Sequence, residues 1–346
     1  MNSAQLNINL KMQPWKPKLH KVPHLTIETN MTCNFSCRNC YNINHTYIKS
    51  LDEVYFEINA GLQKRKADTV TLLGGEPTLH PDLEQIIRYI KSKGLVCQML
   101  TNGFILSGSD GEKLLDTLIA AGLDRILIHV DDGQEAYTDT FQAIHFLLKR
   151  LENRRIFVSL SWTIYKGHQG NLARLIKEFS FYKNVDGILS LLEKNIDEAI
   201  RRDYDGYGMP DMLTEYNSLG KSLRLYPSIY IPSSTDDNRI TWFIYLYYIN
   251  SESHVTFSIS PWLTKAYLRI YLFFTGRELF GKPVMRSAFI LSFLITGLLE
   301  LIANPRRIRE FVLLLKKSSV TKRLRFHYLT IQDGPEYDKV NKTISI

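Results

Sequence analysis

The sequence of 346 residues is poor in cysteine, and the few that it has are unevenly placed. Of four cysteines, three fall between Cys33 and Cys40, and Cys97 stands alone. A disulfide inside so short a loop would constrain the chain very little, and the three cysteines of the loop cannot all pair with one another. A disulfide framework is therefore not predicted. Cysteine usage of this kind fits a reducing compartment.

Long hydrophobic runs are also missing. Residues 1–22 are polar, with scattered lysine and proline, and lack the apolar region of a secretory signal peptide. The uncharged apolar run 287–299 has 13 residues, which is too short to span a bilayer. We therefore expect a cytoplasmic protein, either free or peripheral to the inner face of the membrane.

Basic residues outnumber acidic ones, 43 to 35, for a formal charge of +8. The plain interpretation is a solvated basic surface. The functional alternatives are contacts with an acidic electron donor, an anionic membrane surface or an anionic substrate. No feature of the sequence indicates nucleic-acid binding.

Short apolar, β-branched segments alternate with helical ones through the first half of the chain. Strands are expected at 24–29, 69–73, 95–100, 125–130, 156–164 and 185–192. Helices are expected at about 50–66, 81–93, 112–121, 134–152 and 171–182, the first starting at a Ser50–Glu53 capping box. This alternation predicts an α/β fold with parallel strands and right-handed crossovers.

Cys33, Cys37 and Cys40 form a C-x3-C-x2-C motif directly after the first expected strand. Three thiolates make a poor structural zinc site, which needs four ligands, but a good anchor for a four-iron cluster with one open iron. The motif and its place resemble those of the radical S-adenosylmethionine (radical SAM) superfamily. The sequence departs from the family pattern at Asn39, the residue before the third cysteine, where the family usually has an aromatic residue near the adenine. The aromatic residue here, Tyr41, follows that cysteine instead.

The resemblance implies an open, partial (β/α)6 TIM-like barrel for residues 23–192, with residues 1–22 as an extension. It also implies a [4Fe-4S] cluster, S-adenosylmethionine (SAM) on the open iron, and a flavodoxin- or ferredoxin-type electron donor. Reductive cleavage of SAM would produce methionine and a 5′-deoxyadenosyl radical, which attacks the substrate. The cofactor carries this chemistry and the protein positions it.

Gly74-Gly75-Glu76, after the second strand, matches the GGE motif of that family. Two glycines permit close backbone approach to a ligand, and the resemblance assigns the carboxylate to the SAM ammonium. Thr101 and Asn102 match a further strand end near SAM, although Asn-Gly is also common in plain turns.

Further polar candidates lie on the fourth and fifth strands. His129 and Asp131 share one face of the fourth strand, where they would lie near the ribose or the substrate, or else at an exposed strand end. Ser161, on the same face as Ser159, is a candidate SAM contact by resemblance. Cys97 is interpreted as a core thiol, with hydrogen-atom donation as the alternative. No catalytic residue is assigned.

After residue 192 the alternation stops. Residues 193–260 are predicted to be loop-rich with a β-hairpin, strands 239–249 and 254–259, and residues 261–346 to be a helical, basic extension. The absence of further cysteines excludes auxiliary clusters. The extension combines the apolar run with these basic residues: Arg306, Arg307, Arg309, Lys316, Lys317, Lys322, Arg323 and Arg325. It is either a helical cap over the barrel or a segment lying on an anionic membrane.

Three functions remain open from the sequence. The first is a single-cluster radical SAM enzyme acting on a hydrophobic or membrane-associated substrate. The second is a radical SAM enzyme acting on a peptide, nucleoside or sugar. The third is a non-catalytic iron–sulfur or zinc protein.

Overall fold

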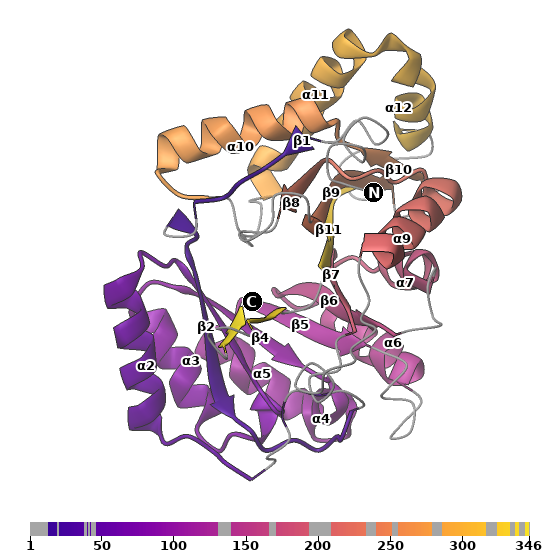
Figure 1. Cartoon of the computed structure of the whole chain (residues 1–346). Coiled ribbons are helices and arrows are strands. Elements are labelled where there is room, and N and C mark those ends of the chain that lie inside the picture. The colour runs from indigo at the N-terminus through magenta and orange to yellow at the C-terminus, as the bar shows by residue number, and fades with distance from the viewer. Residues whose placement is uncertain are drawn as a thin grey trace. The chain divides into compact units, whose positions relative to one another are not determined.

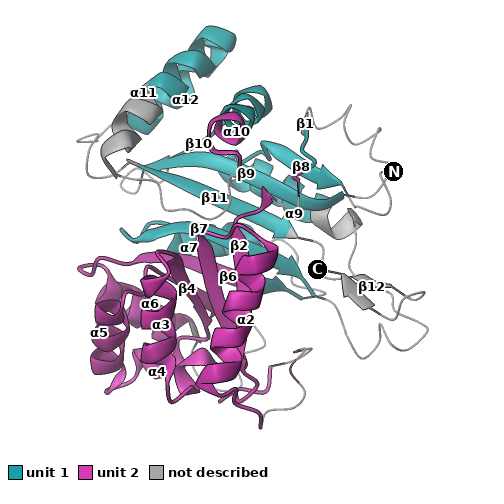
Figure 2. Cartoon of the chain, turned by 90° about the vertical axis from the view of Figure 1, so that its left-hand side faces the viewer, with its two compact units in different colours: residues 1–16, 163–270, 283–346 teal, residues 17–162, 271–282 magenta. Residues whose placement is uncertain are grey.

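A computed structural model describes most of the chain. The described residues are 13–18, 21–37, 40, 42, 46–130, 140–165, 171–193, 209–232, 240–250, 255–278, 286–315, 324–332, 336–338 and 343–345. They form two compact units, coloured separately in Figure 2. Unit 2 comprises residues 17–162 and 271–282, and unit 1 comprises residues 1–16, 163–270 and 283–346.

Unit 2 is built on parallel strands. They are β2 (His24–Asn30), β3 (Thr69–Gly74), β4 (Val96–Thr101), β5 (Arg125–Val130) and β6 (Phe157–Ile164), paired in sequence order. No pairing among the described residues joins β6 back to β2, so this sheet is open. The predicted α/β class and open, partial barrel topology are confirmed.

Helices connect these strands: α2 (Leu51–Lys64), α3 (Leu83–Ser92), α4 (Phe104–Ser107), α5 (Gly111–Ala121) and α6 (Thr140–Leu151). Helix α2 starts at the predicted capping box, in which Ser50 and Glu53 exchange side-chain-to-backbone hydrogen bonds. Helices α2, α3 and α5 lie in a row beside the sheet (Figure 1). Each strand therefore ends in a loop at the same edge, where the polar motifs lie.

Unit 1 contains a mixed sheet. Its members are β7 (Val185–Leu192), β11 (Leu324–Gln332), β9 (Ile240–Asn250), β8 (Ile229–Pro232) and β1 (Gln13–Pro14), in this order. The predicted hairpin is present, because β9 pairs antiparallel with β10 (Val255–Ser258). Strand β7 matches the sixth expected strand.

The C-terminal segment contains the expected helices and also strands that the sequence analysis did not predict. Helices α10 (Pro261–Thr275), α11 (Arg286–Ala303) and α12 (Ile308–Leu315) are present, but β11 follows them and lies between β7 and β9. Two short strands, β12 (Glu336–Asp338) and β13 (Thr343–Ser345), pair with each other. The sequence has the strand signal in Leu324–Gln332, where aromatic and β-branched residues recur, but neighbouring basic residues dominate the segment. The predicted domain boundaries remain a prediction.

Helices α7 (Asn171–Phe179) and α9 (Met209–Leu223) also belong to unit 1. A separate hydrophobic cluster of Tyr248, Phe257, Ile259 and Leu314 joins β9 and β10 to α12. Among the described residues, no helix has the length and apolar character needed to cross a membrane.

His327 of β11 is fully buried, and neither ring nitrogen has a hydrogen-bond partner among the described residues. It faces Tyr247 of β9, with ring centroids 5.6 Å apart. Burial, with a smaller effect of Arg325, lowers the pKa of His327 to about 3 from 6.5. The folded protein therefore keeps this ring neutral over a range in which the unfolded chain protonates it.

The first prediction concerns His327→Phe. Between about pH 3 and 6.5 the unfolded wild type binds one proton more at this site, so its free energy of unfolding falls as the pH is lowered. The variant should lose this contribution, a slope of about 1.4 kcal/mol per pH unit, and should be at least as stable at pH 7. Urea unfolding at several pH values tests this, and parallel profiles for the two proteins would contradict it.

Candidate active site

The turn after β3 is held against the chain after β2 at a distance that only glycine permits. Gly74 has φ +152°, and a Cβ added there would lie 2.0 Å from the Asn30 carbonyl oxygen. A Cβ on Gly75 would lie 2.3 Å from the Thr32 carbonyl oxygen. The two glycines are therefore required for packing of the apoprotein.

Backbone hydrogen bonds close the gap between these two segments. The Gly75 amide donates to the Asn30 carbonyl at 2.7 Å, and the Glu76 amide donates to the Thr32 carbonyl at 2.9 Å. The Asn30 side chain adds bonds from Nδ2 to the carbonyl oxygens of Glu76, at 3.0 Å, and Thr32, at 2.7 Å. The turn thus positions the residue just before Cys33.

The carboxylate of Glu76 is completely buried and accepts four hydrogen bonds. Thr78 donates from its amide at 3.1 Å and its hydroxyl at 2.5 Å. Thr101 donates from its hydroxyl at 2.7 Å, and the Asn102 amide donates at 2.8 Å. Burial raises the pKa of Glu76, and the bonds from Thr78, Thr101 and Asn102 oppose the rise. The motifs predicted separately after β3 and β4 therefore meet at this carboxylate.

Asn102 extends the contact to the cysteine loop. Its Nδ2 donates to Asn34 Oδ1 at 2.7 Å, while its Oδ1 accepts from the Phe104 amide at 3.0 Å. The rings of Phe35 and Phe104 pack with centroids 5.6 Å apart. Asn30, Asn34 and Thr78 were not singled out from the sequence, since isolated Asn and Thr residues carry no motif. Their proximity to Cys33 or Glu76 was the available signal.

None of the three loop cysteines is in a disulfide, and all three are partly exposed. The Phe35 amide donates to Cys33 Sγ at 3.4 Å, and the Cys40 amide donates to the Cys37 carbonyl at 3.3 Å. Burial raises the pKa of Cys33. No three metal-ligand side chains among the described residues gather closely enough for one metal ion. Three accessible thiols on one loop fit the corners of a four-iron cluster, which holds its ligands farther apart than a single zinc ion does.

The remaining candidates are less closely joined. His129 Nδ1 and Ser161 Oγ lie 3.4 Å apart on paired positions of β5 and β6, so the structure brings these two together. Ser159 accepts from buried Arg125 Nη1 at 2.5 Å. Asp131 lies outside the described residues. Cys97 is completely buried in β4, which raises the pKa of its thiol well above the ordinary value and agrees with a core role.

Comparison with known proteins identifies the superfamily. Residues 27–163, which contain the cysteine loop, the GGE turn and the strand ends described above, match the family model of the Radical SAM superfamily. This part of the chain is a radical SAM domain. The protein is an enzyme, and the cofactors of the family are a [4Fe-4S] cluster and SAM. This favours the two enzyme alternatives over the non-catalytic one.

Individual relatives of this radical SAM protein are distant. A Methanocaldococcus jannaschii protein named as a glycyl-radical enzyme activating enzyme is 25% identical over 58% of this chain and 73% of its own length. The GTP 3′,8-cyclase of Chlorobaculum tepidum is 31% identical over 38% of this chain and 41% of its own. The crystal structure of Streptococcus suis SuiB bound to SAM aligns with a TM-score of 0.46 and 16% identity, over 58% of this chain and 49% of that one.

The second prediction tests the close approach at the GGE turn of the radical SAM domain. Gly75→Ala should lower the free energy of unfolding by about 1–3 kcal/mol, because the new Cβ meets two backbone carbonyl oxygens, those of Thr32 and Met31. Gly61→Ala is the matched control, since its Cβ meets only the flexible end of the Leu25 side chain. Urea unfolding of both variants compares them. Equal stability of the two would show that the turn tolerates a side chain.

The third prediction concerns Glu76→Gln. Whichever way the amide is oriented, its NH₂ group faces a backbone donor, that of Thr78 or of Asn102. We expect a loss of about 1–3 kcal/mol in urea unfolding. Glu84→Gln, at an exposed ion pair on α3, should change stability by less than about 1 kcal/mol. A loss no larger than that of the control would contradict the assigned hydrogen bonds.

Proposed function

We propose that this protein binds a [4Fe-4S] cluster through Cys33, Cys37 and Cys40, and reductively cleaves SAM beside it to modify a hydrophobic or membrane-associated substrate. The main support for cluster and SAM binding is the connected set of hydrogen bonds from Asn34 through Asn102 to Glu76. It ties the cysteine loop to both strand ends that the family resemblance assigns to SAM. The cluster, when bound, supplies the electron for carbon–sulfur cleavage.

The protein side chains would bind and orient SAM. Gly74 and Gly75 keep side chains out of the turn, and Thr101 and Asn102 hold the Glu76 carboxylate. Three of the four protein donors bind Glu76 Oε1, and Oε2 accepts only from the Asn102 amide. Because each carboxylate oxygen has two lone pairs, Oε2 keeps an acceptor position that the SAM ammonium would use. His129, Ser161 and Asp131 are proposed to line the ribose or substrate side.

The substrate proposal rests on the apolar and aromatic composition of the C-terminal third. Trp262, Tyr267 and Ile270 of α10 are exposed, as are several aliphatic residues of α11 and α12. Exposed apolar side chains in such number are typical of interaction surfaces. The alternative substrates are a peptide, a sugar or a nucleoside, and the GTP 3′,8-cyclase relative favours the last of these. A flavodoxin or ferredoxin would donate the electron.

The fourth prediction tests the enzyme chemistry. Protein reconstituted anaerobically with iron and sulfide should release 5′-deoxyadenosine from SAM when dithionite is added. Cys37→Ala should lose this activity, because the cluster loses one of its three ligands. Product is quantified by liquid chromatography and mass spectrometry.

Cys97→Ala serves as the matched control, since this thiol is buried in β4 away from the loop. It should retain the iron content and deoxyadenosine formation. Equal loss in both variants would indicate general unfolding. A reconstituted wild type that holds four irons but leaves SAM intact would contradict the proposed function.

A further inference from the structure

Helix α11 exposes a row of large apolar side chains. Its members among the described side chains are Ile295, Leu298, Leu299 and Ile302, and Ile302 is 68% exposed. Their spacing of three, one and three residues places them on one face of the helix. Helix α12 continues the pattern with exposed Ile308, Val312 and Leu313. We call these seven residues the hydrophobic face of the α11–α12 hairpin.

The opposite side of the hairpin is firmly packed. Gly297 of α11 lies so close to Phe311 of α12 that a Cβ would come within 2.4 Å of its ring. Phe311 packs edge-on against Phe257 of β10, with centroids 5.7 Å apart, and Leu314 is completely buried. Asn250 of β9 donates to the Leu314 carbonyl at 2.7 Å. The hydrophobic face is therefore exposed on helices that are already anchored to the sheet of unit 1.

The acidic side chains of the hairpin are paired with an arginine, whereas two of its other arginines are exposed to solvent. Its acidic residues, Glu300 and Glu310, both pair with Arg307, at 2.7 and 3.2 Å. Arg307 also donates to the Ser258 carbonyl at 2.6 Å and lies over the Phe257 ring. Arg306 and Arg309 point to solvent instead. The outer surface of the hairpin is consequently apolar with positive charge and no uncommitted acid.

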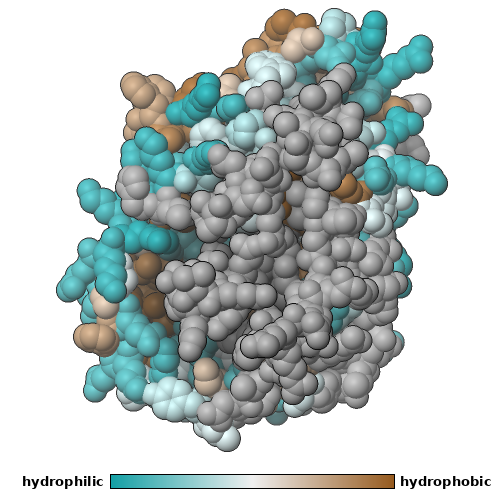
Figure 3. Space-filling view, viewed as in Figure 1, coloured by the Kyte–Doolittle hydropathy of each residue, from teal (hydrophilic) through white to brown (hydrophobic). Residues whose placement is uncertain are grey.

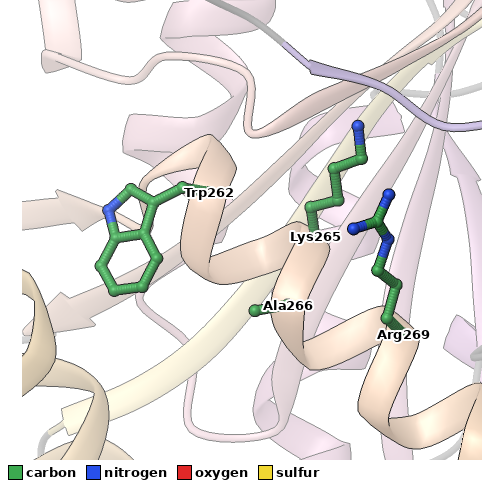
Figure 4. Close-up of a pocket in the computed structure, with 4 residues that line it drawn as sticks. All are labelled: Trp262, Lys265, Ala266 and Arg269. Atoms are coloured by element: carbon green, nitrogen blue, oxygen red, sulfur yellow. The ribbon is translucent and has the colours of Figure 1, made fainter.

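Helix α10 carries a related combination. The Ser260 amide, at its start, donates to Glu300 Oε1 at 2.5 Å, which holds α10 beside α11. Trp262, Lys265, Ala266 and Arg269 line a surface pocket on α10, and Figure 4 shows the two cationic side chains extending side by side. Figure 3 has the same view as Figure 1. In the region where Figure 1 places α11 and α12, it shows hydrophobic and hydrophilic residues next to each other on the surface.

From these observations we infer that the hydrophobic face of the α11–α12 hairpin docks on the surface of a bilayer containing anionic phospholipid. Apolar residues would enter the headgroup boundary while Arg306 and Arg309 pair with lipid phosphates. A second copy of the chain fits this surface poorly, because it would present the same arginines and no free acid. Docking on a bilayer would place the enzyme next to a hydrophobic substrate dissolved in the membrane. Only this link to the substrate rests on the proposed function; the docking itself does not.

The experiment is co-sedimentation of the full-length protein, without cluster reconstitution or SAM, with vesicles. The vesicles are phosphatidylcholine alone or with roughly a quarter phosphatidylglycerol. We expect binding to the anionic vesicles that weakens with added salt. The double variant Leu298→Ser/Ile302→Ser should lower the partition coefficient at least about ten-fold. Arg306→Gln and Arg309→Gln should each lower it by about five-fold.

Phe56→Ser and Arg88→Gln, at exposed positions of α2 and α3, are matched controls and should bind as the wild type does. The inference is overturned if wild type stays in the supernatant, if it binds neutral vesicles equally well, or if the double variant binds unchanged. Concentration-dependent dimerisation that the same double variant abolishes would overturn it in favour of self-association. Because no SAM is present, these outcomes are separate from the deoxyadenosine assay.

Discussion

The buried carboxylate of Glu76 is the interaction on which the active site depends. A buried charge without partners is strongly unfavourable, and this one is satisfied by four donors drawn from two separate loops. Its main chain meanwhile bonds to the side chain of Asn30, the last residue of β2, and to the carbonyl of Thr32 just beyond. One residue therefore fixes the ends of β2, β3 and β4 relative to one another. A cofactor site assembled from three loops requires such a fixed point.

In unit 1, Arg307 has a comparable structural role. Its guanidinium pairs with Glu300 and Glu310, donates to the Ser258 carbonyl and covers the Phe257 ring. Glu300 in turn accepts from the amide at the start of α10. Helices α10, α11 and α12 are thus joined to β10 by one cation, which leaves their apolar side chains free to face solvent. Because Arg307 pairs with both acidic residues of the hairpin, the exposed charges beside the apolar side chains are positive, which is the basis of the inferred membrane contact.

The core and the cofactor motifs were predictable because their signals are local. The strands that lead to Cys33, Gly74 and Thr101 are short apolar segments that alternate with helices, and parallel strands bring their carboxyl ends to one edge. The contacts of Asn34 and Asn102 were not predictable, since the pair is separated by 68 positions and joined only through packing. Strand β11 was missed for a related reason. Its pairing with β9 and β7 depends on long-range contacts, while the basic residues around it suggested an exposed helical segment.

The most direct test of the central claim is electron paramagnetic resonance of the reduced, reconstituted protein with and without SAM. If three cysteines on the β2 loop hold a four-iron cluster with an open iron beside the Glu76 turn, the signal of the reduced cluster should change when SAM is added. An unchanged signal, with four irons bound per chain, would show that SAM does not reach the cluster. The assembly of the three loops would then serve the fold alone.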